Sequence, residues 1–134
     1  MADALHLRII SPATMVVDDY VPTAELPGSE GDFGVLPGHE ACFAMLRAGV
    51  INVQFADGIH RRFFAASGYA EVTATACTVI SDHVQDLADI SMAEAQEALT
   101  AARAAVEHTQ TPAARCQAEK LVQSAEALVH ALAA

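Results

Sequence analysis

The stretch 27–49, PGSEGDFGVLPGHEACFAMLRAG, most constrains the fold because it holds five glycines and two prolines. Glycine permits positive φ and close backbone approach, whereas proline fixes φ and lacks an N–H donor. So many breakers exclude a long helix and predict tight turns around very short strands. We expect the apolar residues between the turns to need a core, and these are Phe33, Val35, Leu36, Phe43, Met45 and Leu46. The acids Glu30, Asp32 and Glu40 are expected at the turns, within reach of water or a partner.

The glycine spacing in Gly28-x-x-Gly31-x-x-Gly34 has a second interpretation, a phosphate cradle. Glycine-rich loops present backbone N–H groups to anions. This loop contains no Lys or Arg, it contains two carboxylates, and no helical pattern begins at its end. These features favour a structural turn or a protein-contact loop.

Short apolar segments separated by turn residues continue through the first two thirds of the chain. Leu5, Leu7 and Ile9 alternate with polar residues, which is typical of a half-buried strand. Further strands are expected at 15–17, 20–26, 50–55, 59–66, 69–75 and 77–81, the last of the series. Pro22 makes 20–26 an edge or bulged strand, and Asp57-Gly58 predicts a hairpin. The pattern favours an antiparallel sandwich or barrel.

The composition changes after residue 87, and we expect a β-sandwich domain at 1–87 and an α-helical hairpin at 88–134. Ser91 and Glu94 form a capping box, and Thr111 precedes Pro112 as the N-cap of a second helix. Two apolar stripes follow these caps: Met92, Ala95, Leu99, Ala102 and Val106, then Ala114, Ala118, Leu121, Ala125, Leu128 and Leu132. Alanine favours helix but buries little area, so the hairpin is predicted to be a mobile arm.

Composition limits the functions of the chain. Its 134 residues carry a net charge of −10, which argues against nucleic acid and anionic lipid as partners. No apolar run is long enough to span a membrane, and no signal segment opens the chain, so we expect a cytosolic protein or one bound to something facing the cytosol. Cys42, Cys77 and Cys116 are widely spaced, which predicts three reduced, mostly buried thiols.

The sequence contains no pattern that assembles a catalytic site. His39-Glu40 lacks the second histidine of a zinc-protease helix, and Ser67-Gly68 lacks the nucleophile elbow. The side chains with metal-binding chemistry, His39, Cys42, His60, Cys77 and His83, show no ligand spacing. We therefore expect no catalytic residue, metal or cofactor. The chain is interpreted as a β-sandwich adaptor, with a small hydrolase or metal enzyme as a less favoured alternative.

The segment 28–39, GSEGDFGVLPGH, resembles the GSEG(D/E)xGxxPGH signature of the epsilon subunit of F-type ATP synthase. Further similarity to that family lies at 6–12, 46–51, 64–72 and 78–80, so the resemblance covers about the whole chain. It implies an α+β fold, with an N-terminal ten-stranded antiparallel β-sandwich followed by a C-terminal antiparallel two-helix hairpin.

The resemblance also implies a role. Epsilon is a non-catalytic part of the central rotor that joins the gamma shaft to the ring of c subunits and couples proton translocation to ATP synthesis. By resemblance, Glu30, Gly31 and Asp32 contact the c ring and His39 contacts gamma. The hairpin reaches the catalytic alpha and beta subunits in some members. The implied location is peripheral, on the cytoplasmic face of the bacterial inner membrane.

The hairpin departs from the family pattern. Members that bind ATP carry I/L-D-x-x-R-A where this chain has Ile90, Ser91, Glu94 and Ala95 in the corresponding positions. Losing the guanidinium and gaining a carboxylate argue against phosphate binding, although a nucleotide-sensing regulatory module remains the alternative function. From residue 88 the chain has three basic side chains, Arg103, Arg115 and Lys120, against six acids. We therefore expect only weak regulation of ATP hydrolysis by this arm.

Overall fold

The computed structural model describes residues 4–133, and the chain divides into two compact units, Met1–Asp86 and Leu87–Ala134. This division lies one residue from the one expected from the sequence. Each unit is described by itself.

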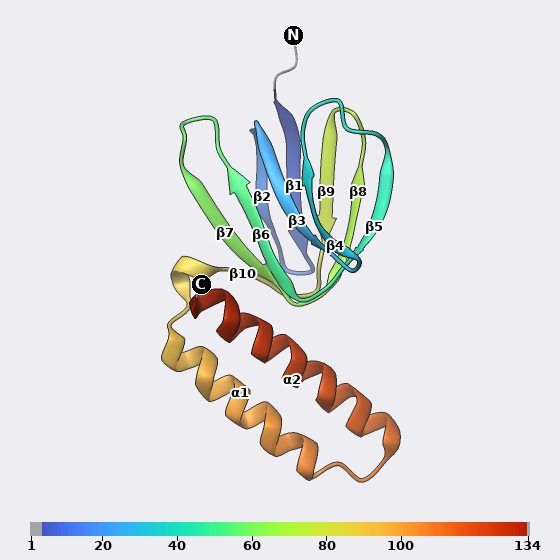
Figure 1. Ribbon diagram of the computed structural model, residues 1–134, viewed down its shortest axis with the longest axis vertical. Helices are drawn as coiled ribbons and strands as arrows, with labels where there is room; N and C mark the ends of the chain where they lie inside the picture. Colours follow the sequence, from blue (N-terminus) through green and yellow to red (C-terminus); the bar gives the residue numbers. More distant parts are fainter. Residues whose placement is uncertain (1–3, 134) are drawn as a thin grey trace. The chain divides into compact units, whose positions relative to one another are not determined.

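The first unit is a β-sandwich of ten strands (Figure 1). They are β1 (Leu5–Ser11), β2 (Thr14–Val21), β3 (Thr23–Gly28), β4 (Gly31–Val35), β5 (Cys42–Leu46), β6 (Gly49–Gln54), β7 (His60–Ala65), β8 (Gly68–Val72), β9 (Ala76–Ile80) and β10 (Val84–Asp86). Their order is β10-β7-β6-β3-β5-β8-β9-β1-β2, and β4 pairs with β3. The ten-stranded sandwich followed by two helices confirms the predicted α+β class.

One strand pair is not antiparallel. β1 runs parallel to β9, with Leu7 opposite Cys77 and Ile9 opposite Val79. Hairpins force neighbouring strands to be antiparallel, but β1 and β9 are separated by most of the sandwich, so no tight turn sets their relative direction.

The core follows the period-two pattern of the strands. In β1, Leu5, Leu7 and Ile9 are fully buried while His6 and Arg8 are partly exposed. Phe63 and Phe64, predicted as core residues, are both buried. Because alternate side chains of a strand point to opposite faces, β1 contributes one row to the core and one to the surface. β7 departs from this pattern, since the neighbouring Phe63 and Phe64 are both buried.

Several strand boundaries differ from the sequence prediction. Pro22 lies between β2 and β3, not inside a strand, and β2 continues through Asp18 and Asp19. Both carboxylates are accommodated because they are exposed while paired in register with β1. The segment 77–81 is not the last strand, since β10 follows it and pairs with β7.

Three residues expected in the core are instead exposed: Leu36 by 58%, Phe43 by 61% and Met45 by 56%. Val35 and Leu46 are buried as expected. Phe43 and Met45 lie on the outer face of β5, while Ala44 and Leu46 lie on the opposite face. Leu36 follows the last residue of β4, in a loop.

The second unit contains a short 3₁₀ turn, η1 (Leu87–Asp89), and two helices, α1 (Met92–Glu107) and α2 (Pro112–Ala133), which pack on each other. Ser91 is the N-cap of α1, and its hydroxyl accepts a hydrogen bond from the Glu94 N–H at 3.1 Å. The Glu94 carboxylate accepts from the Ser91 hydroxyl, not from the backbone N–H as in a full capping box. Thr111 Oγ1 accepts from the Ala114 N–H at 3.1 Å.

The predicted stripe of α1 matches its least exposed positions, and that of α2 is confirmed at Ala118, Ala125, Leu128 and Leu132 but not at Ala114 and Leu121. Leu121 is 63% exposed, and the buried Ala131 is a position that the predicted stripe lacks. The partly buried Val122 takes the place that the sequence pattern gave to Leu121.

Candidate protein-contact surface

The predicted ring-contact residues lie in the tight turn between β3 and β4. Gly28 pairs with Gly31 across this hairpin, which places Ser29 and Glu30 at its tip. Gly31 has φ +138°, a conformation that a side chain would strain. The Ser29 N–H donates to the Met45 carbonyl at 2.9 Å, so the tip of the turn is fixed to β5.

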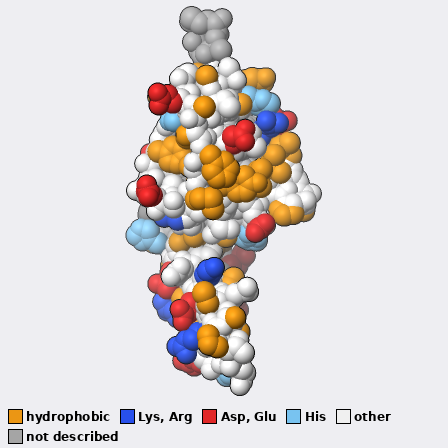
Figure 2. Space-filling view, turned by 90° about the vertical axis from the view of Figure 1, so that its right-hand side faces the viewer, with side chains coloured by type: hydrophobic (Ala, Val, Ile, Leu, Met, Phe, Trp, Pro, Cys, Tyr) orange, Lys and Arg blue, Asp and Glu red, His pale blue; other side chains and the backbone are white. Residues whose placement is uncertain are grey.

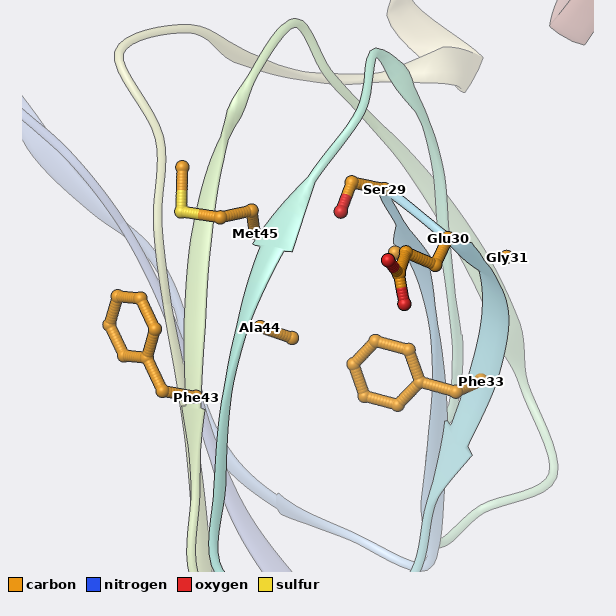
Figure 3. Close-up of a pocket in the computed structure, with 8 residues that line it drawn as sticks. Ser29, Glu30, Gly31, Phe33, Phe43, Ala44 and Met45 are labelled. Carbon is orange, nitrogen blue, oxygen red and sulfur yellow. The ribbon is translucent and has the colours of Figure 1, made fainter.

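A shallow groove of about 360 Å³ separates this turn from β5. Figure 3 shows the Glu30 carboxylate and the Phe33 ring pointing into the groove, with Ala44 opposite them. A carboxylate beside an aromatic ring suits a positively charged side chain, which can pair with the acid and contact the ring.

Of the two acids of the turn, one is paired with a basic side chain and the other is not. Arg47 binds the Asp32 carboxylate through Nη2 and donates from Nη1 to the Gly28 carbonyl at 2.6 Å. Among residues 4–133, no hydrogen bond or ion pair involves the Glu30 carboxylate. Glu30 is therefore the acid of this turn that a partner can bind without breaking an existing ion pair.

The register of five strands assembles a row of apolar side chains that we call the apolar strip. Met45 pairs with Tyr69, Tyr69 with Ile80, Ile80 with Ile10, and Ile10 with Met15. The strip thus crosses β5, β8, β9, β1 and β2. Figure 2 shows hydrophobic side chains gathered on the face of the sandwich turned to the viewer.

The strip is exposed along its length. Met45 is 56% exposed, Met15 47%, Ile80 37% and Tyr69 36%, and Ile10 is partly exposed. Phe43 extends it, since its ring stacks on Tyr69 with centroids 5.1 Å apart. Contiguous exposed apolar patches are characteristic of protein–protein or membrane interaction sites and of ligand-binding grooves.

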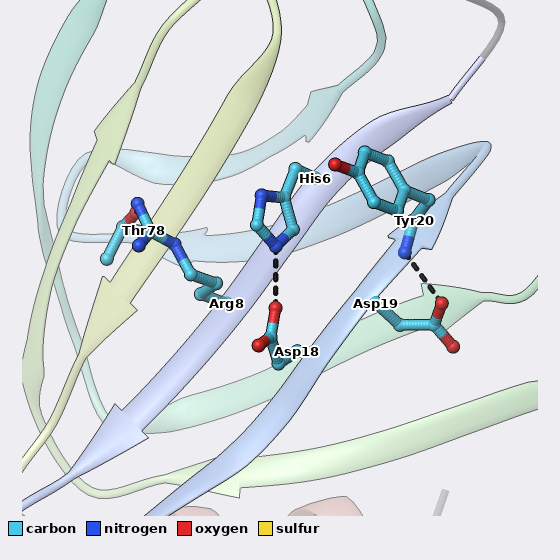
Figure 4. Close-up of polar contacts among 6 residues, drawn as sticks. All are labelled: His6, Arg8, Asp18, Asp19, Tyr20 and Thr78. Atoms are coloured by element: carbon cyan, nitrogen blue, oxygen red, sulfur yellow. Dashed lines mark hydrogen bonds and ion pairs between the residues drawn. The ribbon is translucent and has the colours of Figure 1, made fainter.

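A polar cluster borders the strip on β1 and β2 (Figure 4). His6 Nε2 lies 2.6 Å from Asp18 Oδ1, and the His6 ring stacks on Tyr20. Arg8 donates from Nη2 to Thr78 Oγ1 at 3.2 Å, while its buried Nε has no partner among the described residues. The face therefore combines apolar contact area with fixed polar groups, as protein interfaces do.

His39, the predicted gamma contact, lies in the loop between β4 and β5. Its backbone N–H donates to the Leu36 carbonyl, and its Nδ1 is 2.7 Å from the Glu40 carbonyl. The neighbouring Gly38 N–H donates to the Ala74 carbonyl at 2.7 Å. His39 and Glu30 thus lie beyond opposite ends of β4, and the structure does not bring them together.

The cysteines and histidines do not gather. No group of three or more His, Cys, Asp or Glu side chains within residues 4–133 is placed to hold a metal ion. Cys77 is buried, but Cys42 and Cys116 are exposed, which corrects the expectation of mostly buried thiols. Cys116 lies on the exposed side of α2, and Cys42 opens β5 where the strand leaves the loop.

A well-packed sandwich with an exposed apolar strip and an acidic turn has the features of a protein-binding module. Comparison with known proteins agrees: residues 4–86 match the β-sandwich domain of the ATP synthase delta/epsilon chain. The ATP synthase epsilon chain of Rhodospirillum rubrum is 34% identical over 131 residues, covering 98% of each chain. That of Maricaulis maris is 38% identical over 128 residues, covering 96% of each. The chain therefore belongs to the family of ATP synthase epsilon chains.

Solved structures show the same fold. A chain in the cryo-EM structure of the Euglena gracilis mitochondrial ATP synthase OSCP/F1/c-ring superposes with a TM-score of 0.83 at 24% identity, covering 97% of this chain and 82% of that one. A chain from the Tetrahymena thermophila mitochondrial ATP synthase central stalk/c-ring has a TM-score of 0.66 at 12% identity, covering 96% of each. No helix within the described residues is long and apolar enough to cross a membrane.

Sequence reasoning missed the apolar strip. The available signal was the segment Cys42–Leu46, in which every residue is apolar. A strand of a two-layer sandwich turns only one of its two faces to the core, so an apolar side chain at every position indicates that the outer face is apolar too. The pairing that joins Met45 to Met15 through three intervening strands depends on the register, which no local pattern specifies.

Proposed function

We propose that this chain is a non-catalytic subunit of the ATP synthase rotor that joins the gamma shaft to the c ring and couples proton translocation to ATP synthesis. The exposed apolar strip supports the proposal most directly. A surface of this kind on an otherwise well-packed sandwich needs a protein partner to cover it. The family relationship supports ATP synthase as the complex in which that partner is found.

Gamma is the proposed partner of the apolar strip. Covering a large apolar side chain contributes about 1.5–3 kcal/mol before the costs of association. Phe43 and Tyr69 are already stacked, so little side-chain freedom is lost when a partner covers them. His39 remains a proposed gamma contact, since its loop leads directly into β5.

The turn Glu30, Gly31 and Asp32 is the proposed contact with the c ring. The unpaired Glu30 carboxylate and the adjacent Phe33 ring suit a lysine or arginine on the polar loops of the ring. Gly31, which has no side chain, lets the partner backbone approach the turn closely.

The hairpin is proposed to reach the catalytic alpha and beta subunits and to regulate ATP hydrolysis weakly, because acids outnumber basic residues along it. The proposed location is the cytoplasmic face of the bacterial inner membrane, as a peripheral part of the complex. We propose no catalytic residue, cofactor or metal.

Two matched substitutions test the gamma contact. Met45 in the strip and Ile59 in the β6–β7 turn are both 56% exposed. We expect Met45→Asp to weaken binding to co-expressed gamma by at least about tenfold, or about 1.4 kcal/mol, while Ile59→Asp leaves it unchanged. Both variants should unfold at the wild-type temperature. Equal gamma binding by both variants, or wild-type protein that fails to co-purify with gamma, would overturn the assignment.

A further inference from the structure

We propose that Arg47 is a positioning residue for the ring-contact turn: it withdraws Asp32 from partner binding and holds Glu30 in place to bind a positively charged side chain. This inference rests on the proposed ring contact. It assigns different roles to two acids that the sequence presents as equivalent.

Arg47 makes three contacts with the β3–β4 hairpin. Its backbone N–H donates to the Pro27 carbonyl at 3.0 Å, Nη1 donates to the Gly28 carbonyl at 2.6 Å, and Nη2 pairs with Asp32. The first two acceptors lie at the end of β3 and the third in β4. The guanidinium group of Arg47 therefore binds both strands of the hairpin, and its backbone N–H adds a second bond to β3.

Glu30 lies between the residues that Arg47 binds. It is between Gly28 and Asp32 in the chain, and the Ser29 N–H adds a bond to the Met45 carbonyl. The same β5 segment lines the groove into which Glu30 points (Figure 3). Arg47 thus binds the hairpin on both sides of Glu30, at Gly28 and at Asp32, without touching Glu30 itself.

Replacing Arg47 should strengthen ring binding if the net charge of the turn governs it, and should weaken ring binding if the position of Glu30 does. The substitution therefore distinguishes the two effects. With Arg47 present, Asp32 is neutralised and the turn carries one net negative charge; without it, the turn carries two. If charge alone governs the contact, Arg47→Gln strengthens binding to a positively charged partner. If Arg47 positions Glu30, the same substitution weakens binding despite the added negative charge.

The test uses the full chain in complex with gamma and measures its dissociation constant for the detergent-solubilised c ring of the same ATP synthase. We expect Glu30→Gln to weaken binding about tenfold, which is the loss of one charge-assisted hydrogen bond. Arg47→Gln should weaken it several-fold. Arg47→Lys, which keeps the charge and one donor position, should recover part of that loss. Asp32→Asn should weaken binding less than Arg47→Gln, since Arg47 still reaches the Gly28 carbonyl.

Two controls keep the outcomes distinct. The double variant Arg47→Gln/Asp32→Asn restores the wild-type net charge of the turn and should still bind more weakly than wild type, because the contacts of Arg47 are lost. Unchanged binding to gamma shows that each variant retains the folded sandwich. If wild-type protein and Glu30→Gln bind the ring equally, the proposed ring contact fails. If Glu30→Gln loses binding while Arg47→Gln binds as tightly as wild type or tighter, only the positioning role fails.

Discussion

Cys77 illustrates how burial changes the chemistry of one residue. Its side chain is fully buried in β9, and burial, with a smaller contribution from Cys42, raises the pKa of the Cys77 thiol to about 12. The thiolate is the reactive form of cysteine. We expect a maleimide at pH 7.5 to label Cys42 and Cys116 within minutes, and Cys77 only after denaturation. Peptide mass spectrometry before and after urea addition measures this, and early Cys77 labelling would contradict the buried assignment.

The same raised pKa has a consequence for stability at high pH. An unfolded chain releases the thiol proton from pH about 9 upward, whereas the folded chain retains it up to about 12. The unfolded state therefore binds fewer protons in this window, and the free energy of unfolding contributed by Cys77 falls as pH rises through it. A Cys77→Ala variant, which has no thiol to titrate, should lose less stability between pH 8 and pH 10.5 than wild type in urea unfolding.

Gly68 is a residue whose replacement the backbone does not tolerate. It has φ +135°, and an added Cβ would lie 2.2 Å from the Ile80 carbonyl oxygen. We expect Gly68→Ala to lower the free energy of unfolding by at least about 2 kcal/mol. Gly34 is the control, since a Cβ there meets nothing within 4 Å and its φ is not positive. Gly34→Ala should change stability by less than about 0.5 kcal/mol in the same urea titration.

At the scale of the element, β5 shows what the sequence determined and what it did not. Turn residues and alternation predicted most of the strand segments, though not β10, because glycine, proline and β-branched side chains act locally. The prediction that Phe43 and Met45 lie in the core is wrong, since both are exposed. Hydrophobicity alone does not distinguish a face that packs in the core from one that a partner covers. The Arg47–Asp32 ion pair could not be predicted from the sequence either, since it depends on how β5 lies against the β3–β4 hairpin.

The first turn of α1 carries a prediction about nucleotides. Ser91 and Glu94 are bonded to each other at the helix N-terminus, so this end of α1 already holds a carboxylate. The N-terminal end of a helix attracts anions, but Glu94 already supplies that charge and repels another. Calorimetric titration of the wild-type chain with Mg-ATP should show no binding up to millimolar nucleotide. Micromolar affinity would instead support the nucleotide-sensing alternative.

At the scale of the whole molecule, the two units differ in what holds them together. The main core cluster consists entirely of sandwich residues, from Leu5 to Val79. The buried residues of the two α-helices are three alanines and one leucine, namely Ala95, Ala118, Leu128 and Ala131. Because alanine buries little apolar area, we expect amide hydrogens in 91–134 to exchange faster than those of β1, β8 and β9. Equally slow exchange in both units would contradict the prediction of a mobile arm.

The independence of the sandwich core leads to a truncation test. Removing 89–134 leaves every member of the core cluster, the apolar strip and the Arg47-bound turn in the chain. We expect the truncated protein to fold with nearly the wild-type unfolding temperature, to bind gamma and the c ring, and to support proton-coupled ATP synthesis in reconstituted vesicles. Because the hairpin carries more acidic than basic residues, ATP hydrolysis by the complex should change by less than about twofold, or about 0.4 kcal/mol. A large rise in hydrolysis would show that the hairpin inhibits the enzyme by contacts other than charge, and loss of gamma binding would show that the gamma interface extends beyond the sandwich.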